Sequence, residues 1–328
     1  MQVEDTAVKN NSKRDRYLLT KEYAYLRSKC IQNISYTLSF KFEHFSDFYE
    51  VEAIIEFDII KPFDLILECG AHSIKEMEIN SHKLSNNEIS SVWKDNSLTI
   101  IPILVKIGRN KIKIVSKSRF SRDSSGFHSF TDTESINHQY CYTVGPPNYA
   151  HRIYPCFDQP DLKAYFTLKV TAPDSWVIIG NTPVIKEEEM NGNKNWEFEK
   201  TPLISTYLFS IAAGNYRKIA YKKTTKVPLA IYLTEKRYFP LLNQADEIFE
   251  LIDAAINFYE NFFQIPFPFK KYDQVFCPEF KYLGMENPGM ALIIENYAFM
   301  SRISPYKIAA RALTFVHELS HMRFGNYA

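Results

Sequence analysis

The residues best suited to chemistry lie near the carboxyl end, in the sequence His317-Glu318-Leu319-Ser320-His321. Two histidines four residues apart project from one face of a helix, so both imidazoles can reach a single metal ion. Glu318 would not be a ligand but could take a proton from a metal-bound water. A zinc ion lowers the pKa of such a water to roughly 7, which makes it a nucleophile at neutral pH. The alternative is that these side chains lie on a partly exposed helix face without a metal.

A second candidate carboxylate, Glu286, lies upstream in a loop that spans residues 278–289. Gly284 and Asn287 accompany it, and a glycine at such a position allows the backbone to approach a ligand closely. Taken alone, a loop glutamate is more often a solvated surface carboxylate. The importance of Glu286 therefore depends on whether the fold brings it to the HExxH sequence.

The periodicity of the chain predicts the elements that must position these residues. Ser304 is a favourable N-cap and Pro305 suits a first helical turn, which predicts a helix of roughly twenty residues ending near Gly325. An apolar stripe at helical spacing predicts another helix over residues 238–263. Alternation of apolar and polar residues predicts half-buried strands before this helix, and two more strands are expected after it. The strand candidates are residues 32–42, 50–60, 111–116, 165–172, 176–181, 196–200, 207–214, 227–234, 271–280 and 291–295.

The order of these elements predicts an α+β fold in two main parts. We expect a polar arm over residues 1–16 and a mostly antiparallel β domain over residues 17–235. Residues 236–328 would then form the beginning of a mixed helical and β domain, which stops at Ala328.

The composition excludes several classes of protein. Apolar residues make up 45% of the chain, which is too many for intrinsic disorder. Lys and Arg number 39 against 38 Asp and Glu, so there is no bulk charge to attract nucleic acid or an anionic membrane. No apolar run approaches the roughly eighteen residues of a membrane span, and the N-terminus lacks the apolar segment of a secretory signal. The five cysteines are scattered without a CxxC pair, which is typical of reduced thiols in a cytoplasmic protein.

The sequence resembles the gluzincin aminopeptidases, that is, aminopeptidase N and its relatives. Their two marks are a GxMEN loop and a downstream HExxH helix followed by FGN, and this chain has LGMENPG and HELSHMRFGN in the same order. The resemblance implies a saddle-shaped β domain packed on a thermolysin-like catalytic domain. Further similarity covers most of the chain, at residues 150–173, 201–216 and 266–280.

The resemblance also implies roles for individual residues. His317 and His321 would bind zinc, and Glu318 would be the general base. Glu286 would bind the free α-amine of a peptide substrate, so that cleavage starts at the N-terminus. Gly284 and Met285 would form the backbone edge that holds the peptide, and Asn287 would complete the substrate-binding site.

The chain departs from the family pattern at several positions. The third zinc ligand in the family is a glutamate about nineteen residues beyond the second histidine, so we expect it from a segment after Ala328 or from a partner. Val144 and Pro146 stand where the family has Gln or Glu residues that help to bind the amine, and neither side chain can accept a hydrogen bond. Arg323 stands where tryptophan is usual, and we expect it to be solvated on the helix surface.

Two hypotheses of different classes follow. The first is a zinc aminopeptidase that removes N-terminal residues from peptides. The second is a truncated or degenerate relative that has no catalytic activity and binds peptides or proteins. Among the other candidate residues, we expect Asp158 to form a structural ion pair with Arg152, His151 to lie at a surface or domain interface, and Cys156 to be a buried hydrophobic residue.

Overall fold

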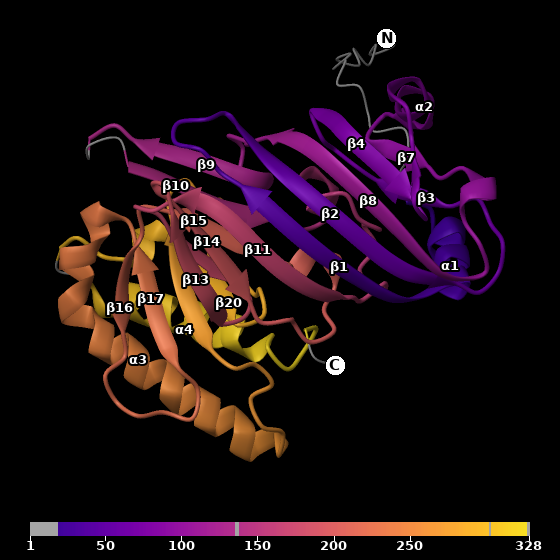
Figure 1. Cartoon of the computed structure of the whole chain (residues 1–328). Helices are drawn as coiled ribbons and strands as arrows, with labels where there is room; N and C mark the ends of the chain where they lie inside the picture. The colour runs from indigo at the N-terminus through magenta and orange to yellow at the C-terminus, as the bar shows by residue number, and fades with distance from the viewer. Residues whose placement is uncertain (1–18, 135–137, 302, 327–328) are drawn as a thin grey trace, which may run out of the picture.

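The computed structural model describes residues 19–134, 138–301 and 303–326 of the 328-residue chain. The polar arm expected over residues 1–16 lies outside the described residues. The described part is mostly β, with strands in four sheets and four α-helices (Figure 1). The expected α+β fold is confirmed. None of the helices in these ranges is long and apolar enough to cross a membrane.

An eight-stranded sheet forms the outer layer of the N-terminal part. Its neighbouring strands are antiparallel, except that β1 and β11 run parallel. The long strands β1, β2 and β8 bury alternate side chains on one face, as their alternating sequence predicts. In spatial order the strands are β13 (Val184–Met190), β14 (Asn193–Phe198), β11 (Tyr165–Pro173), β1 (Ile31–Lys41), β2 (Phe48–Ile59), β8 (Gly108–Arg119), β4 (Ser73–Ile79) and β5 (His82–Lys83).

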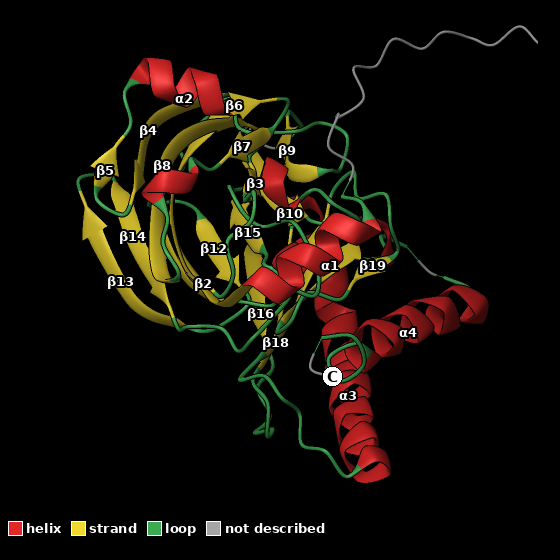
Figure 2. Ribbon diagram, turned by 90° about the vertical axis from the view of Figure 1, so that its right-hand side faces the viewer, coloured by secondary structure: helices red, strands yellow, loops and turns green. Residues whose placement is uncertain are grey.

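Two smaller sheets contribute to the core on the inner face of this layer. A four-stranded sheet contains β12 (Val177–Gly180), β15 (Ile211–Gly214), β10 (His138–Val144) and β9 (Gly126–Asp132). A three-stranded sheet contains β3 (Ile66–Glu68), β7 (Ser97–Thr99) and β6 (Trp93–Lys94). Helices α1 (Lys21–Cys30) and α2 (Asn86–Val92) also belong to this part (Figure 2).

A five-stranded mixed sheet and two helices form the C-terminal part. The sheet order is β16 (Arg217–Ala220), β17 (Leu229–Leu233), β18 (Tyr272–Cys277), β20 (Met290–Ile294) and β19 (Gly284–Met285). Helices α3 (Glu235–Phe263) and α4 (Pro305–Ser320) supply apolar side chains to one core with this sheet. Ile252 of α3, Phe276 of β18 and Leu319 of α4 are members of that core.

The opposite face of the five-stranded sheet packs against the four-stranded sheet. Tyr142 and Val144 from β10 share a buried cluster with Val275 of β18, Leu292 of β20 and Met285 of β19. The five-stranded sheet is therefore a central layer, with helices on one side and the N-terminal part on the other.

The division expected at residues 235 and 236 does not follow the strand pairing. Strands β16 and β17, which we assigned to the N-terminal domain, pair with each other and with β18 of the C-terminal sheet. Alternation along a strand reports burial but not the sheet to which the strand belongs. We therefore propose a boundary between Gly214, the end of β15, and Arg217, the start of β16.

Candidate active site

Helix α4 carries the HExxH sequence, and its start has the predicted cap. Ser304 accepts a hydrogen bond from the backbone N–H of Lys307 at 3.4 Å. The helix ends at Ser320, earlier than the predicted end near Gly325. The reason is a tightening of the last turn, since the N–H of Arg323 bonds to the carbonyl of Ser320 at 3.1 Å with three-residue spacing.

The two histidines of the motif face each other. His321 is the C-cap residue but keeps helical dihedrals, with φ −61° and ψ −23°, so it stays on the face of His317. The two Nε2 atoms lie 3.2 Å apart. The Nδ1 of His321 lies 3.2 Å from the carbonyl oxygen of Phe324, which can only accept, so Nδ1 carries the proton. The Nε2 of His321 is then the nitrogen with the lone pair, and it faces the Nε2 of His317.

This separation is suited to a shared metal ion. Two nitrogen ligands of a tetrahedral zinc ion, with bonds of about 2.05 Å, lie about 3.3 Å apart. Glu286, Glu318 and His321 each have a ligand atom within 4.8 Å of the others, so carboxylates adjoin the same space. The donor set of imidazole and carboxylate is one that zinc accepts. The residues present therefore fit zinc in both chemistry and spacing.

Glu318 is buried between α4 and β19, with 5% of its surface exposed. The absence of a side chain at Gly284 makes this possible, because a Cβ atom there would lie 2.3 Å from Oε1 of Glu318. Burial, together with the smaller effect of the nearby charge of Glu286, raises the pKa of the Glu318 carboxyl to about 8. A carboxyl of this kind exchanges a proton near neutral pH.

Glu286 follows β19 directly, and its position is fixed through its backbone. The side-chain Nδ2 of Asn326 donates to the carbonyl of Glu286 at 2.6 Å. Asn326 is 1% exposed, and its own N–H bonds to the carbonyl of His321 at 3.3 Å. One buried residue thus links the end of the HExxH segment to the loop that carries Glu286.

The other two predicted residues of the loop turn inward. Met285 belongs to the buried cluster that joins the two parts, so only its backbone can face a ligand. Asn287 is 2% exposed, and its Nδ2 has no hydrogen-bond partner among the described residues. Among the residues that the structure describes, strand β19 pairs with β20 alone, which leaves its other edge without a neighbouring strand there.

The N-terminal part holds the start of the loop. The hydroxyl of Tyr142 donates to the carbonyl of Pro278 at 2.8 Å, and the hydroxyl of Ser124 donates to the carbonyl of Glu279 at 2.7 Å. The Nδ1 of His128 accepts from the backbone N–H of Ser124 at 3.2 Å, so its Nε2 carries the proton that faces Glu279 at 3.1 Å. Burial lowers the pKa of His128, although the charge of Glu279 opposes this shift.

The structure corrects the prediction for Arg323. Its side chain is 3% exposed instead of solvated, and Nε and Nη2 donate to the carbonyl of Ile265 at 3.2 and 2.6 Å. Burial lowers the pKa of Arg323. The guanidinium thus connects the end of the HExxH segment to the chain that follows α3, a tertiary contact that no local sequence pattern predicts.

Three further residues named in the sequence analysis lie in the N-terminal part. His151 is 8% exposed and buried, and its Nδ1 lies 2.7 Å from Oδ2 of Asp158, a partnership that the sequence reasoning missed. Cys156 is fully buried, as expected of a hydrophobic residue. Val144 is also fully buried, in the cluster that contains Met285.

Comparison with known proteins gives relatives over most of the chain. It is 33% identical over 282 residues to aminopeptidase N of Streptomyces lividans, which covers 85% of this chain and 32% of the relative. It is 35% identical over 185 residues to leucyl aminopeptidase of Saccharolobus solfataricus, covering 54% of this chain and 22% of the relative. It is 29% identical over 183 residues to endoplasmic reticulum aminopeptidase 1 of Mus musculus, covering 55% and 19%. The chain thus spans a third or less of the length of these relatives.

Two family models match the chain, in the same order as the two parts of the fold. The model of the peptidase M1 N-terminal domain matches residues 32–208, and the model of the peptidase family M1 domain matches residues 248–328. The first match alone covers more than half of the sequence, and the chain therefore belongs to peptidase family M1.

Proposed function

We propose that this chain carries the metal site of a zinc-dependent aminopeptidase, which removes N-terminal residues from peptides. The observation that carries the proposal is the contact of the His317 and His321 Nε2 atoms at 3.2 Å, beside the buried Glu318. The names of the relatives, aminopeptidase N and leucyl aminopeptidase, support a peptidase.

His317 and His321 would hold the metal, and the third protein ligand would be a glutamate from beyond Ala328 or from a partner. Zinc bound there would lower the pKa of a water and polarise the scissile carbonyl. The two imidazoles are already turned toward one point, so little reorganisation would be needed on binding. The half-buried position of His321 would keep solvent away from one side of the site.

Glu318 would take the proton of the attacking water and deliver it to the leaving amine. It lies on the same helix as both histidines, and Gly284 leaves its carboxyl room against β19. Its carboxylate lies in one cluster of ligand atoms with His321 and Glu286, a position suited to proton transfer.

Glu286 would bind the ammonium group of the peptide and so define where cleavage begins. A carboxylate binds an ammonium group through charge-assisted hydrogen bonds. These bonds are strong when the site is partly shielded from water. The unpaired edge of β19, at Gly284 and Met285, would pair with the backbone of the substrate as an added strand. The buried Asn287 would hold the turn between these residues and β20, since its carbonyl accepts from the N–H of Met290 at 3.0 Å.

The runner-up is a relative without catalytic activity that binds peptides or proteins. It is favoured by Val144, which is fully buried, and by Pro146, since neither offers an acceptor for the amine. A cytoplasmic location also belongs to the proposal, and is supported by five free, buried cysteines.

Zinc titration by calorimetry and hydrolysis of a leucyl arylamide separate these functions. We expect His321→Ala to abolish zinc binding, whereas Glu318→Gln keeps zinc and loses turnover. His82→Ala, at an exposed histidine of β5, is the matched control and should change neither. Zinc binding that survives His317→Ala and His321→Ala would contradict the proposal. Peptide binding that persists in chelator and in Glu318→Gln, without turnover, would support the runner-up.

A further inference from the structure

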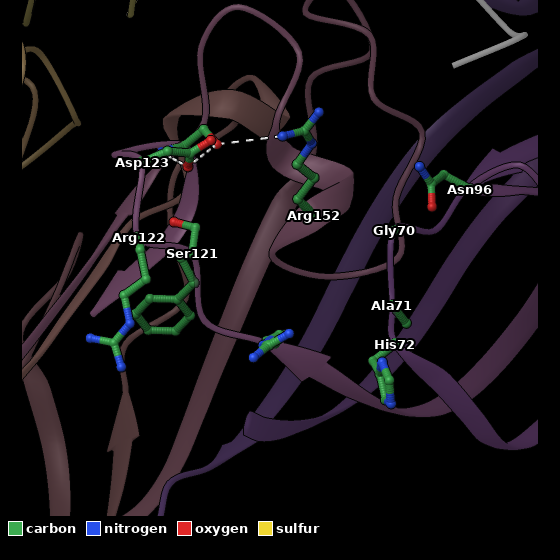
Figure 3. A pocket seen from close by; sticks show the side chains of 11 residues that line it. Gly70, Ala71, His72, Asn96, Ser121, Arg122, Asp123 and Arg152 are labelled. Atoms are coloured by element: carbon green, nitrogen blue, oxygen red, sulfur yellow. Dashed lines mark hydrogen bonds between the residues drawn. The ribbon is translucent and has the colours of Figure 1, made fainter. Parts of the chain in front are cut away.

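A hollow of about 570 Å³ opens in the N-terminal part, apart from the HExxH site. None of its lining residues comes from the loop 278–289 or from α4. Its walls come from the turn before β4, the connection from β8 to β9, the turn before β7 and the short helix over Ala150–Arg152. Figure 3 shows Arg122, Arg152 and His72 placed around this space.

The lining of the hollow is strongly cationic for a nearly neutral chain. Arg119, Arg122 and Arg152 line it together with His72, and Asp123 is the one acidic residue among the lining residues that the structure describes. The whole chain has a net charge of only +1. Three guanidinium groups around one space repel each other unless an anion lies between them.

Asp123 offsets only part of this positive charge, that of Arg152. The hydrogen bond from Ser125 and the charge of Arg152 both lower the pKa of the Asp123 carboxyl. Its Oδ1 accepts from the hydroxyl of Ser125 at 2.6 Å and from the N–H of Ser125 at 3.2 Å. The Nη1 of Arg152 in turn lies 3.4 Å from the same hydroxyl. The carboxylate is therefore engaged at the end of the hollow formed by Arg152, and Figure 3 shows it on the side of the space away from His72.

Arg119 and Arg122 have donors to spare. In the described parts of the chain, the guanidinium of Arg119 has one recorded contact, with the ring of Phe48 at 5.7 Å. Arg122 donates through Nη1 to the carbonyl of Ser129 at 2.6 Å and lies 3.3 Å from Asp47 through Nη2, which leaves further N–H groups of its five.

One wall also contains an unused polar group. The Oγ of Ser121 is buried and has no hydrogen-bond partner among the described residues. A buried hydroxyl without a partner is costly, and a ligand in the hollow is one way to provide the partner. This observation is independent of the charges.

We propose that this hollow is a binding site for a small oxyanion, a molecule that bears a phosphate or several carboxylates. The planar fork of arginine matches the oxygens of both groups with two parallel hydrogen bonds; Arg119 provides such a fork, and Arg122 adds its remaining N–H groups. The volume is within the range of small-molecule sites, so the anion can carry an organic portion. Asp123 directs the anionic group to the end of the hollow that is formed by Arg119 and Arg122.

The test is calorimetry with the full chain at constant ionic strength, using pyrophosphate in one arm and citrate in the other. We expect saturable binding in at least one arm, and the stronger arm identifies phosphate or carboxylate as the preferred group. Arg119→Gln and Arg122→Gln should each weaken binding about tenfold, because each removes a positive charge and its charge-assisted donors. Retention of the wild-type unfolding temperature in chloride buffer shows that these variants are folded.

Arg109→Gln is the matched control, since Arg109 is an exposed arginine on the same strand β8 but pairs with Glu56 and Asp58. The affinity of Arg109→Gln for either anion should stay within about twofold of that of the wild-type chain. The proposal is overturned if neither anion binds, or if Arg109→Gln weakens binding as much as Arg119→Gln does, which would mean attraction to surface charge alone. A rise of the unfolding temperature with pyrophosphate or citrate, absent in Arg119→Gln, supports it.

Discussion

The close contact between Gly284 and Glu318 allows a sharp test of how the site is assembled. An alanine at Gly284 would place its Cβ 2.3 Å from Oε1 of Glu318 and 2.5 Å from both Cδ and Cγ. Contacts of this kind are normally no closer than about 3.4 Å, so the overlap is about 1 Å. The side chain of Glu318 cannot move away freely, because it is buried in α4 against the sheet.

The expected cost follows from this overlap. Forcing one extra methyl group into a packed interior costs about 1–3 kcal/mol of unfolding free energy. If the cost arises from Glu318 itself, it disappears when that side chain is shortened. The free energy lost in Gly284→Ala should therefore fall close to zero in the Glu318→Ala background, with a coupling energy of about 1–3 kcal/mol.

The measurement is urea unfolding of the unchanged chain, the two single variants and the double variant, in chelator so that metal binding does not contribute. The control is Gly192→Ala, because a Cβ there meets no atom within 4 Å and strains only the backbone, which has a φ of +79°. Gly192→Ala should show no coupling to Glu318→Ala. A coupling energy for Gly284 below about 0.5 kcal/mol would refute the packing of Glu318 against β19.

Three further predictions concern the contacts around the site. Asn326→Ala should lower the unfolding free energy by about 1–3 kcal/mol in a urea titration, because the carbonyl of Glu286 loses its buried donor; an unchanged midpoint would contradict this contact. Arg323→Met should cost a similar amount, since the carbonyl of Ile265 loses two donors, and a variant as stable as the original would show that the guanidinium is not engaged. The pKa of His128 is lowered in the folded chain, so as the pH falls this histidine is protonated first in the unfolded chain. The free energy of unfolding should therefore decrease as the pH drops below about 6.5. Urea unfolding curves between pH 7.5 and 5.5 should show a smaller decrease for His128→Gln, and an equal decrease would contradict the burial of His128.

Some of the fold and site could be predicted because the signals are local. The spacing of His317 and His321 requires only a helix, and the Ser304 cap and apolar stripe predict that helix. The amphipathic pattern also predicted α3, although the helix begins at Glu235, three residues before the expected start.

The remaining features depend on contacts between distant segments. Burial of Arg323 depends on the carbonyl of Ile265, which lies 58 residues away in the sequence. The approach of Glu286 to Glu318 depends on the place of β19 at the edge of a sheet, and alternation within two residues cannot specify an edge. The same limit explains why the pairing of β17 with β16 and with β18 of the C-terminal sheet could not be predicted.

The cluster shared by β10, β18, β19 and β20 restricts the exchange of segments between relatives. A chimera that joined the N-terminal part of one family member to the five-stranded sheet of another would place two unmatched apolar surfaces in contact. Val144, Met285 and Leu292 would have to be transferred as a set, although they come from three separate strands. We therefore expect recombination near Gly214 to succeed only between donors with compatible side-chain volumes on both faces of the junction.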